Sequence, residues 1–163
     1  MSADKKDGGS KMVTENRKAF HEYFILDRFE TGIVLTGTEI KAAREGKVQL
    51  RDAYAEIVQG EVWLRNAHFS PYSHGNIWNH EPTKKRKLLM RKAEIRKLTG
   101  KTVEKGLTLV PLKMYLKNGW LKCEVGLCKG KKSHDKRDAI AEREQNLEAK
   151  RAMNARNTRA HDN

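Results

Sequence analysis

The chain has 163 residues, of which 37% are hydrophobic and 34% are charged, and its formal net charge is +13. This hydrophobic content suffices for one modest core, and such a surplus of cations is typical of proteins that meet a polyanion. No apolar run approaches the roughly 20 residues of a membrane-spanning helix, and no apolar stretch typical of a signal peptide follows the N-terminal lysines. Two cysteines are too few for a disulfide scaffold. We therefore expect a cytoplasmic protein.

Charge and aromatic content divide the chain into three segments. Residues 1–15 carry no net charge, and residues 129–163 carry ten basic and six acidic side chains. All eleven aromatic residues lie between Phe20 and Trp120. We therefore expect a disordered N-terminal arm over 1–15, a folded body over 16–128 and a basic C-terminal tail over 129–163.

A strand and a helix are expected near the start of the body. Phe20 to Leu35 is rich in aromatic and β-branched residues and predicts a long strand bent near Gly32. The segment Thr36-Gly-Thr-Glu39 fits a capping box, in which the threonine oxygen and the glutamate carboxylate satisfy otherwise unpaired backbone amides. Because Gly46 suits the far end, we expect a short helix over about 37–45.

The middle of the body predicts a hairpin, a short strand and a second helix. The hairpin runs from about Asp52 to Ala67 around the turn Gln59-Gly60. Lys87 to Met90 is a candidate short strand, and Arg91 to Leu98 predicts a short helix that ends near Gly100. The apolar pairs expected across the hairpin are Ala55 with Leu64 and Ile57 with Val62.

The clearest hairpin runs from Leu107 to Cys128 around Asn118-Gly119, since Asn-Gly is the favoured two-residue turn with φ > 0 at both positions. Side chains alternate between the two faces of a strand, so Cys123 and Cys128 point to opposite faces and cannot bond each other. Cys123 is expected in the core. The turn predicts four pairs on one apolar face: Leu116 with Leu121, Met114 with Cys123, Leu112 with Val125, and Val110 with Leu127.

The opposite face of this hairpin is basic and aromatic. Ammonium groups for phosphates and flat rings for bases are the combination that nucleic-acid platforms use. The alternative is a solvated strand face with ordinary cross-strand pairs. The residues of this face are Lys113, Tyr115, Lys117, Trp120 and Lys122.

Antiparallel strands with short helices between them therefore make up the predicted body. In a segment of this size, the pattern favours a mostly β fold with short helices, in the form of an OB-fold-like antiparallel β-barrel.

The long connection from Ser70 to Arg86 is a second candidate for RNA binding. Long loops in compact domains are often functional, and this one ends in four consecutive cations, Lys84, Lys85, Arg86 and Lys87. Such a run suits a phosphate contact, because each neutralised phosphate releases counterions. A run that only increases solubility is the alternative.

The histidines and acidic residues predict neither a metal site nor catalysis. His68, His74 and His80 are each six residues apart, and no pair with the spacing of zinc ligands accompanies them. The chain also contains no P-loop, dinucleotide fingerprint or nucleophile elbow. We expect no cofactor and no catalytic residue.

The C-terminal tail has a helical composition but almost no apolar stripe. Ala, Glu and Arg dominate residues 138–153, yet of the apolar residues only Ile140 and Leu147 align at i, i+7. A short isolated helix of this kind is marginal in water. We therefore expect the tail to be disordered alone and helical when bound to an anion, or else to be an expendable solubilising tail.

Several motifs resemble the SmpB family of bacterial SsrA-binding proteins. The resemblance spans residues 16 to about 145, and the last motif is the most diagnostic. The matching segments are Asn16-Arg-Lys-Ala-Phe-His-Glu-Tyr-Phe-Ile25, Thr31-Gly-Ile-Val-Leu-Thr-Gly-Thr-Glu-Ile-Lys41, Pro82-Thr-Lys-Lys-Arg-Lys-Leu-Leu89 and Lys129-Gly-Lys-Lys-Ser-His-Asp-Lys-Arg137.

The resemblance implies an OB-fold RNA-binding adaptor of trans-translation and not an enzyme. It implies binding to the tRNA-like domain of transfer-messenger RNA (tmRNA) and delivery of that RNA to stalled ribosomes, for rescue of the ribosome and tagging of the nascent peptide. The RNA-contacting residues of the family fall on Asn16, His21, Glu30 and Leu89, and Arg17 and Lys18 within the first motif join these candidates.

The resemblance also implies further partners. These are the ribosome, mainly its small-subunit RNA, and elongation factor Tu and alanyl-tRNA synthetase through the charged tmRNA, with the protein acting as a monomer. The family's tail enters the empty messenger channel and the decoding centre and becomes helical there. The tail residues that fall on this motif are Lys129, Lys131, Lys132, His134, Asp135, Lys136 and Arg137.

Three other functions share some of these features. A structural ribosomal protein would share the charge, the tails and the barrel. An RNA-processing enzyme would need an acid or base that the sequence does not display. A general single-strand binder would bind unstructured RNA as tightly as folded RNA.

Overall fold

The computed structural model describes residues 10–131 and 133–161, and within them the side chains of residues 76, 104–105, 133–139 and 156–161 are not described. The chain divides into two compact units, Met1–Gly130 and Lys131–Asn163. Each unit is treated by itself below.

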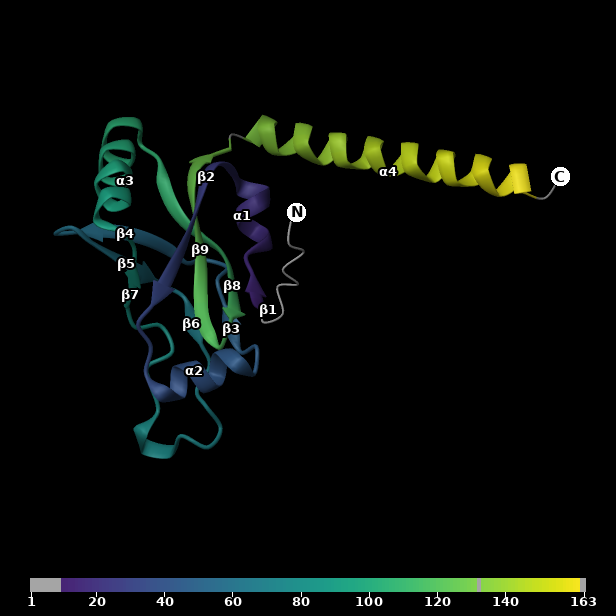
Figure 1. The fold of residues 1–163 in the computed structure, drawn as a ribbon. Helices are drawn as coiled ribbons and strands as arrows, with labels where there is room; N and C mark the ends of the chain where they lie inside the picture. The colour runs from purple at the N-terminus through teal and green to yellow at the C-terminus, as the bar shows by residue number, and fades with distance from the viewer. Residues whose placement is uncertain (1–9, 132, 162–163) are drawn as a thin grey trace, which may run out of the picture. The chain divides into compact units, whose positions relative to one another are not determined.

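Strands form most of the first unit (Figure 1). Seven of them make one antiparallel sheet in the order β1-β8-β4-β5-β7-β2-β9, and an additional pairing of β8 with β9 closes the hydrogen bonds into a ring. Two short strands, β3 (Val48–Gln49) and β6 (His68–Phe69), pair separately. The seven strands are β1 (Lys11–Glu15), β2 (Tyr23–Ile33), β4 (Tyr54–Val58), β5 (Glu61–Arg65), β7 (Arg86–Leu89), β8 (Thr108–Lys117) and β9 (Trp120–Gly130).

Short helices connect these strands. The first, α1 (Arg17–Glu22), precedes β2, while α2 (Gly37–Arg44) and α3 (Lys92–Lys105) lie at opposite ends of the unit in Figure 1. A 3-10 turn, η1 (Asn76–Trp78), lies between β6 and β7, and α4 (Ser133–His161) forms the second unit. None of the described helices combines the length and the apolar character needed to cross a bilayer.

Apolar side chains, mostly from the strands of the ring, form the main core. Val62, Leu64, Phe69, Met114 and Cys123 are completely buried in it. Burial of such a side chain contributes about 1.5–3 kcal/mol, so the ring is stabilised mainly by these contacts. The complete burial of Cys123 confirms that it fills core space, and this burial raises the pKa of its thiol to about 12.

Both predicted hairpins are confirmed. Gln59 and Gly60 have φ values of 51° and 74°, and Asn118 and Gly119 have φ values of 51° and 80°. Positive φ at both positions is the two-residue turn that continues the twist of the flanking strands. The first hairpin has the expected apolar pairs, Ala55 with Leu64 and Ile57 with Val62.

The register expected for the second hairpin is correct near the turn and wrong beyond it. Leu116 pairs with Leu121 and Met114 with Cys123, as expected. A β-bulge between Pro111 and Lys113 then shifts the register, so that Val125 is opposite Pro111 and Leu127 is opposite Leu109.

The bulge turns part of β8 toward a second core cluster, formed by Ala19, Val110, Leu112 and Cys128. Leu112 lies directly over Gly126, where an added Cβ would come within 2.9 Å of the Leu112 side chain. The expectation of one continuous apolar face is therefore corrected: α1 packs on the second cluster while the ring encloses the first.

The expectation of a disordered arm over 1–15 is wrong for Lys11–Glu15. These residues form β1, which pairs with the edge of β8 and packs Val13 against the core. Edge pairing adds backbone hydrogen bonds that composition alone does not reveal. Residues 1–9 of this segment lie outside the described residues.

Two helix boundaries also differ from expectation. Phe20 lies in α1 and not in the long strand, which begins only at Tyr23. The helix α3 passes through Gly100 and continues to Lys105, and its C-cap, Gly106, has a φ of 60°, which suits a left-handed helix end. Glycine inside a helix costs about 1 kcal/mol relative to alanine, and the complete burial of Leu98 offsets that cost.

The helix predicted for the tail is present as α4, and the expectation that it orders only on binding stays a prediction. The helix spans 29 residues, well beyond the ~12–15 residues below which isolated helices are marginal. Its described side chains from Ile140 to Ala155 are all exposed. Helix propensity over this length, and not burial of an apolar face, accounts for the element.

Candidate nucleic-acid interface

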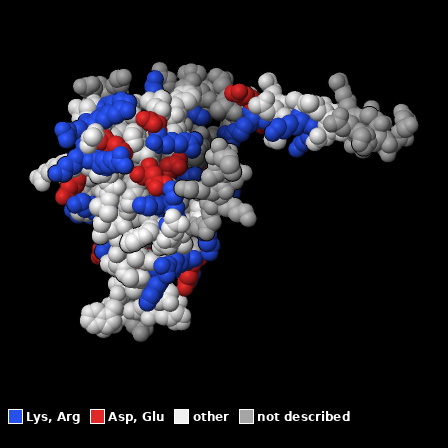
Figure 2. All heavy atoms as spheres, viewed as in Figure 1, with Lys and Arg blue, Asp and Glu red and all other residues white. Residues whose placement is uncertain are grey.

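The outward-facing side chains of β7, β2, β9 and β8 form one continuous surface. The register places Leu89 opposite Gly32, Gly32 opposite Lys122, and Lys122 opposite Tyr115, so these four residues form a row across four strands. In Figure 2, Lys and Arg cover the region over β2, β9 and β8, with Asp and Glu between them. We call this surface the strand face, defined by Arg28, Glu30, Leu89, Lys113, Tyr115, Lys117, Trp120, Lys122 and Glu124.

The Glu30 carboxylate is held at the centre of the strand face. The Tyr115 hydroxyl donates a hydrogen bond to Glu30 Oε2, and Lys117 Nζ lies 3.6 Å from the same oxygen. The hydrogen bond from Tyr115 is the main cause that lowers the pKa of Glu30, with further lowering from Lys117 and Lys122. Burial, together with the hydrogen bond to Glu30, raises the pKa of Tyr115. The site therefore presents an ionised, oriented acceptor.

Part of the positive charge of the strand face is neutralised within it. Glu124 lies 3.3 Å from Arg28 Nη1 and 3.4 Å from Lys113 Nζ. The Lys113 ammonium also lies 5.6 Å from the centre of the Tyr115 ring. The face is thus a network of alternating charges, which suits contacts with base edges as well as phosphates.

Apolar groups are exposed beside this network. Leu89 is 51% exposed and Trp120 is 73% exposed. Gly32 separates Leu89 from Lys122, and an added Cβ at Gly32 would lie 3.3 Å from Leu89 Cβ. A shallow hollow of about 690 Å³ opens here. Arg28 and Gly32 are features of this site that sequence reasoning missed, although a glycine inside a strand can signal close approach.

The structure shows a structural role for Asn16 that the sequence did not predict. This side chain is 2% exposed, its Oδ1 accepts from the Ala19 amide and its Nδ2 donates to the Pro111 carbonyl at 2.9 Å. Asn16 therefore caps α1 and ties it to β8. It positions the helix at the edge of the cleft described next, which it also lines, and its predicted contact with RNA stays a prediction.

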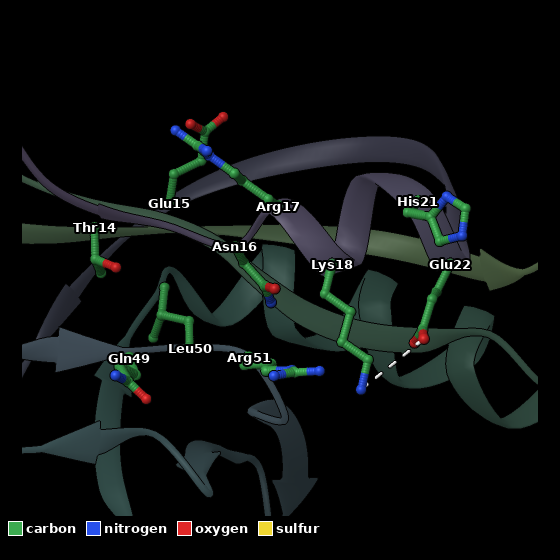
Figure 3. Close-up of a pocket in the computed structure, with 10 residues that line it drawn as sticks. All are labelled: Thr14, Glu15, Asn16, Arg17, Lys18, His21, Glu22, Gln49, Leu50 and Arg51. Atoms are coloured by element: carbon green, nitrogen blue, oxygen red, sulfur yellow. Dashed lines mark ion pairs between the residues drawn. The ribbon is translucent and has the colours of Figure 1, made fainter. Parts of the chain in front are cut away.

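Other residues predicted from the first motif line a cleft between α1 and the segment after β3 (Figure 3). Arg17, Lys18 and His21 come from α1, and Gln49 and Arg51 face them across a cavity of about 600 Å³. Sequence reasoning missed Arg51, because nothing local marks the residues that follow a two-residue strand.

An ion pair crosses one side of this cleft. Lys18 Nζ lies 2.9 Å from Asp52 and 3.9 Å from Glu22. The hydrogen bond to Asp52 raises the pKa of Lys18, and the same bond lowers the pKa of Asp52. Lys18 is therefore already paired, whereas Arg17 is exposed beside it.

The structure also corrects the role predicted for Arg86. Its side chain is completely buried, donates a hydrogen bond to Glu39 and lies 4.1 Å from the centre of the Phe69 ring. Burial raises the pKa of Glu39, but hydrogen bonds from Thr36 and Arg86 outweigh it and keep the pKa below its usual value. Arg86 is a structural anchor and cannot contact RNA.

The three lysines around Arg86 have separate neighbours. Lys84 Nζ lies 3.6 Å from Glu39, and Lys87 Nζ lies 3.2 Å from Glu61. Lys85 lies 4.6 Å from the centre of the Trp63 ring. The four cations therefore do not form one stripe, because Arg86 is buried and Lys84 lies beside Glu39. Lys85 and Lys87 instead lie beside β5, next to Trp63 and Glu61.

The structure describes the predicted tail residues only in part. Lys129 is exposed at the end of β9. Lys132 lies outside the described residues, as do the side chains of His134, Asp135, Lys136 and Arg137. Within the described part of the chain, no cluster of three or more His, Cys, Asp or Glu side chains could hold a metal ion.

Comparisons with known proteins extend across both units. A family model described as SmpB protein matches residues 13–155. The chain is 56% identical to the SsrA-binding protein of Carboxydothermus hydrogenoformans, covering 90% of this chain and 98% of that relative. It is 54% identical to the SsrA-binding protein of Bacillus cytotoxicus, with coverage of 91% and 96%.

A solved structure described as "tmRNA-SmpB: a journey to the center of the bacterial ribosome" contains a similar chain. It is 46% identical with a TM-score of 0.64, and the match covers 78% of this chain and 93% of that chain. The family match over residues 13–155 includes the strand face and the cleft beside α1.

Proposed function

Because this chain belongs to the SmpB protein family, we propose that it is an RNA-binding adaptor of trans-translation. It binds the tRNA-like domain of tmRNA and brings that RNA to stalled ribosomes, where the nascent peptide is tagged. Its work is binding and not catalysis.

The strand face is the observation that supports this function most directly. The ionised Glu30 carboxylate can accept hydrogen bonds from a guanine edge, and Trp120 offers a ring on which a base can stack. The surrounding lysines can neutralise phosphates. Folded RNA offers all three partners at once, which an unstructured RNA does not hold in a fixed geometry.

The closed ring of strands is proposed to be an OB-type barrel. Its pairing order, with β8 and β9 completing the ring, and its short helices support this assignment. OB folds bind nucleic acids on an outer strand face, which is where Glu30 and Tyr115 lie.

The tail is proposed to act on the ribosome. We place α4 in the empty messenger channel and decoding centre, where the cations of Lys129 to Arg137 meet phosphates of small-subunit RNA. Ile140 and Leu147, 41% and 53% exposed, would find apolar partners there. Elongation factor Tu and alanyl-tRNA synthetase would be partners only through the charged tmRNA, and the protein would act as a cytoplasmic monomer.

Competition between two RNAs tests this proposal. The purified protein is titrated with the labelled tRNA-like domain of tmRNA in the presence of an unlabelled, unstructured RNA of equal length. We expect the unstructured RNA to compete at least tenfold less well than unlabelled tRNA-like domain. Equal competition would identify a general single-strand binder and overturn the proposal.

A further inference from the structure

The segment between β6 and β7 carries two apolar side chains that point into solvent. Ile77 is 87% exposed and Trp78 is 84% exposed, and both lie on η1. In Figure 1 this segment lies beyond α2, at the end of the unit opposite α3. We call Ile77 and Trp78 the loop tip; the functions proposed above do not use it.

Side-chain hydrogen bonds close the loop just behind its tip. Asn79 Nδ2 donates to the Tyr72 carbonyl at 2.6 Å, and Asn79 Oδ1 accepts from the Tyr72 amide at 3.0 Å. Gly75 makes room for this bridge, since an added Cβ there would lie 2.8 Å from Asn79 Nδ2. The tip is therefore held in one arrangement although it has little regular structure.

Two further side chains fasten the loop to the folded unit. His80 Nε2 lies 2.9 Å from the Phe69 carbonyl and therefore donates to it, while His80 Nδ1 lies 2.9 Å from Thr38 Oγ1 on α2. The buried guanidinium of Arg86 donates at 3.0–3.1 Å to the carbonyls of Glu81, Pro82 and Lys84.

This bracing matters for binding, because a partner need not order the loop. Ordering an interface segment on association costs free energy that is subtracted from the affinity. Here the hydrogen bonds of Asn79, His80 and Arg86 order it beforehand. A braced loop that exposes a tryptophan and an isoleucine is thus prepared for contact with a partner.

The charges around the tip select a polyanion as that partner. Lys41 of α2 lies 5.4 Å from the centre of the Tyr72 ring, and Arg44 is exposed on the same helix. Glu39 of α2 is buried against Arg86, and Glu45, which follows the helix, is paired with Lys47 at 3.0 Å. Glu81 is the only acidic residue between residues 70 and 85. RNA with an unpaired base offers both matching features, because its phosphates are negatively charged and the unpaired base presents a flat ring for stacking.

We propose that the loop tip binds ribosomal RNA by stacking Trp78 on an unpaired base, with Lys41 and Arg44 toward neighbouring phosphates. This inference rests on the proposed adaptor function. An adaptor that presents one RNA to another needs two surfaces, and the strand face is already assigned to tmRNA. The loop tip lies instead beyond α2, on a different set of elements.

Substitution of Trp78 tests the stacking. We expect Trp78→Ala to bind the tRNA-like domain of tmRNA like the wild type but to weaken binding of the protein–tmRNA complex to stalled ribosomes by about tenfold, the loss typical of one aromatic–base stack. Trp78→Phe should retain most of the wild-type affinity for stalled ribosomes, because an aromatic ring is kept at this position. Val103→Ser removes a residue that is 79% exposed on α3 and should change neither affinity.

Cross-linking identifies the partner. A benzophenone side chain in place of Ile77, in the full-length protein bound to tmRNA on stalled ribosomes, should cross-link to ribosomal RNA on irradiation. Cross-links to tmRNA or to a ribosomal protein would overturn the inference, as would unchanged ribosome binding by Trp78→Ala. Failure of the wild-type protein to bind the tRNA-like domain would instead overturn the proposed function.

Discussion

The Tyr115 hydroxyl reaches across β9 to donate a hydrogen bond to the Glu30 carboxylate. Tyr115 lies on β8 and Glu30 on β2, and β9 pairs with both of these strands. The two residues are 85 positions apart in the chain. The bond fixes the rotamer of an exposed carboxylate and leaves Glu30 Oε1 available to a ligand.

Removal of the Glu30 carboxylate should weaken binding of tmRNA. Glu30→Ala makes the protein more positive, so general electrostatics predicts tighter binding, whereas loss of a specific acceptor predicts a tenfold or greater loss, as for a hydrogen bond to a charged group of about 1.5–3 kcal/mol. Glu45→Ala makes the same change of charge just after α2, outside the strand face, and is the matched control. Electrophoretic titration of the tRNA-like domain decides between them, and tighter binding by Glu30→Ala would make the carboxylate only a surface charge.

Tyr115→Phe should raise the pKa of Glu30 toward the ordinary value for a glutamate. In the folded wild type this pKa is lowered, chiefly by the hydrogen bond from Tyr115. A lowered folded-state pKa contributes stability that is fully present above the unfolded pKa and is lost as pH falls through the folded pKa. Carboxyl-carbon NMR titration of both proteins measures this directly. A pKa that does not change in Tyr115→Phe would show that Lys117 and Lys122 alone determine it.

The pair of Arg86 and Glu39 should be far more sensitive to substitution than the lysines beside it. Arg86→Met leaves Glu39 buried without its partner, which costs about 3–5 kcal/mol of unfolding free energy. The double variant with Glu39→Gln should recover part of this loss, because the uncompensated charge is removed. Lys85→Met is exposed and should cost less than about 1 kcal/mol. Urea unfolding followed by tryptophan fluorescence tests the order of the four proteins, and equal stability of Arg86→Met and Lys85→Met would contradict it.

Substitution of Asn16 should lower the stability of the folded protein and should not remove a direct contact with RNA. Asn16→Ala removes the cap of α1, which costs about 1 kcal/mol, and leaves the buried Pro111 carbonyl without its donor, which adds about 1–3 kcal/mol. Arg17→Ala, at the neighbouring exposed position, should leave the melting temperature unchanged and weaken RNA binding. If instead Asn16→Ala keeps the wild-type melting temperature and loses RNA binding, the side chain contacts RNA and the structural role assigned to it is wrong.

Truncation after Gly130 should separate folding from action on the ribosome. The first unit ends at Gly130, so the core, the strand face and α1 remain, and the melting temperature should barely change. Binding to tmRNA should survive with a modest loss from the missing cations. Tagging on stalled ribosomes should fail, and a purified translation system can measure it beside binding. Tagging at the full-length rate would mean that α4 serves only solubility.

Local chemistry in the sequence determined the hairpins and one helix. Asn118-Gly119 and Gln59-Gly60 specify their turns by tolerating φ > 0, and period-two alternation then specifies which residues pair. The capping box predicted from Thr36 and Glu39 is present in α2. These features depend on neighbours a few residues apart, which is the range over which a sequence pattern carries direct information.

Only the tertiary structure decided what the polar side chains do, because their partners lie far away in the chain. Arg86 belongs to a run of cations, yet it is buried because it pairs with the buried carboxylate of Glu39, 47 residues earlier in the chain. Asn16 reaches the Pro111 carbonyl across 95 residues. The bulge at Leu112 depends on the space above Gly126 on the opposite strand. Burial and hydrogen-bond satisfaction are properties of the packed molecule. The sequence therefore supplied the candidate residues, and only the packing distinguished exposed side chains from those that hold the fold together.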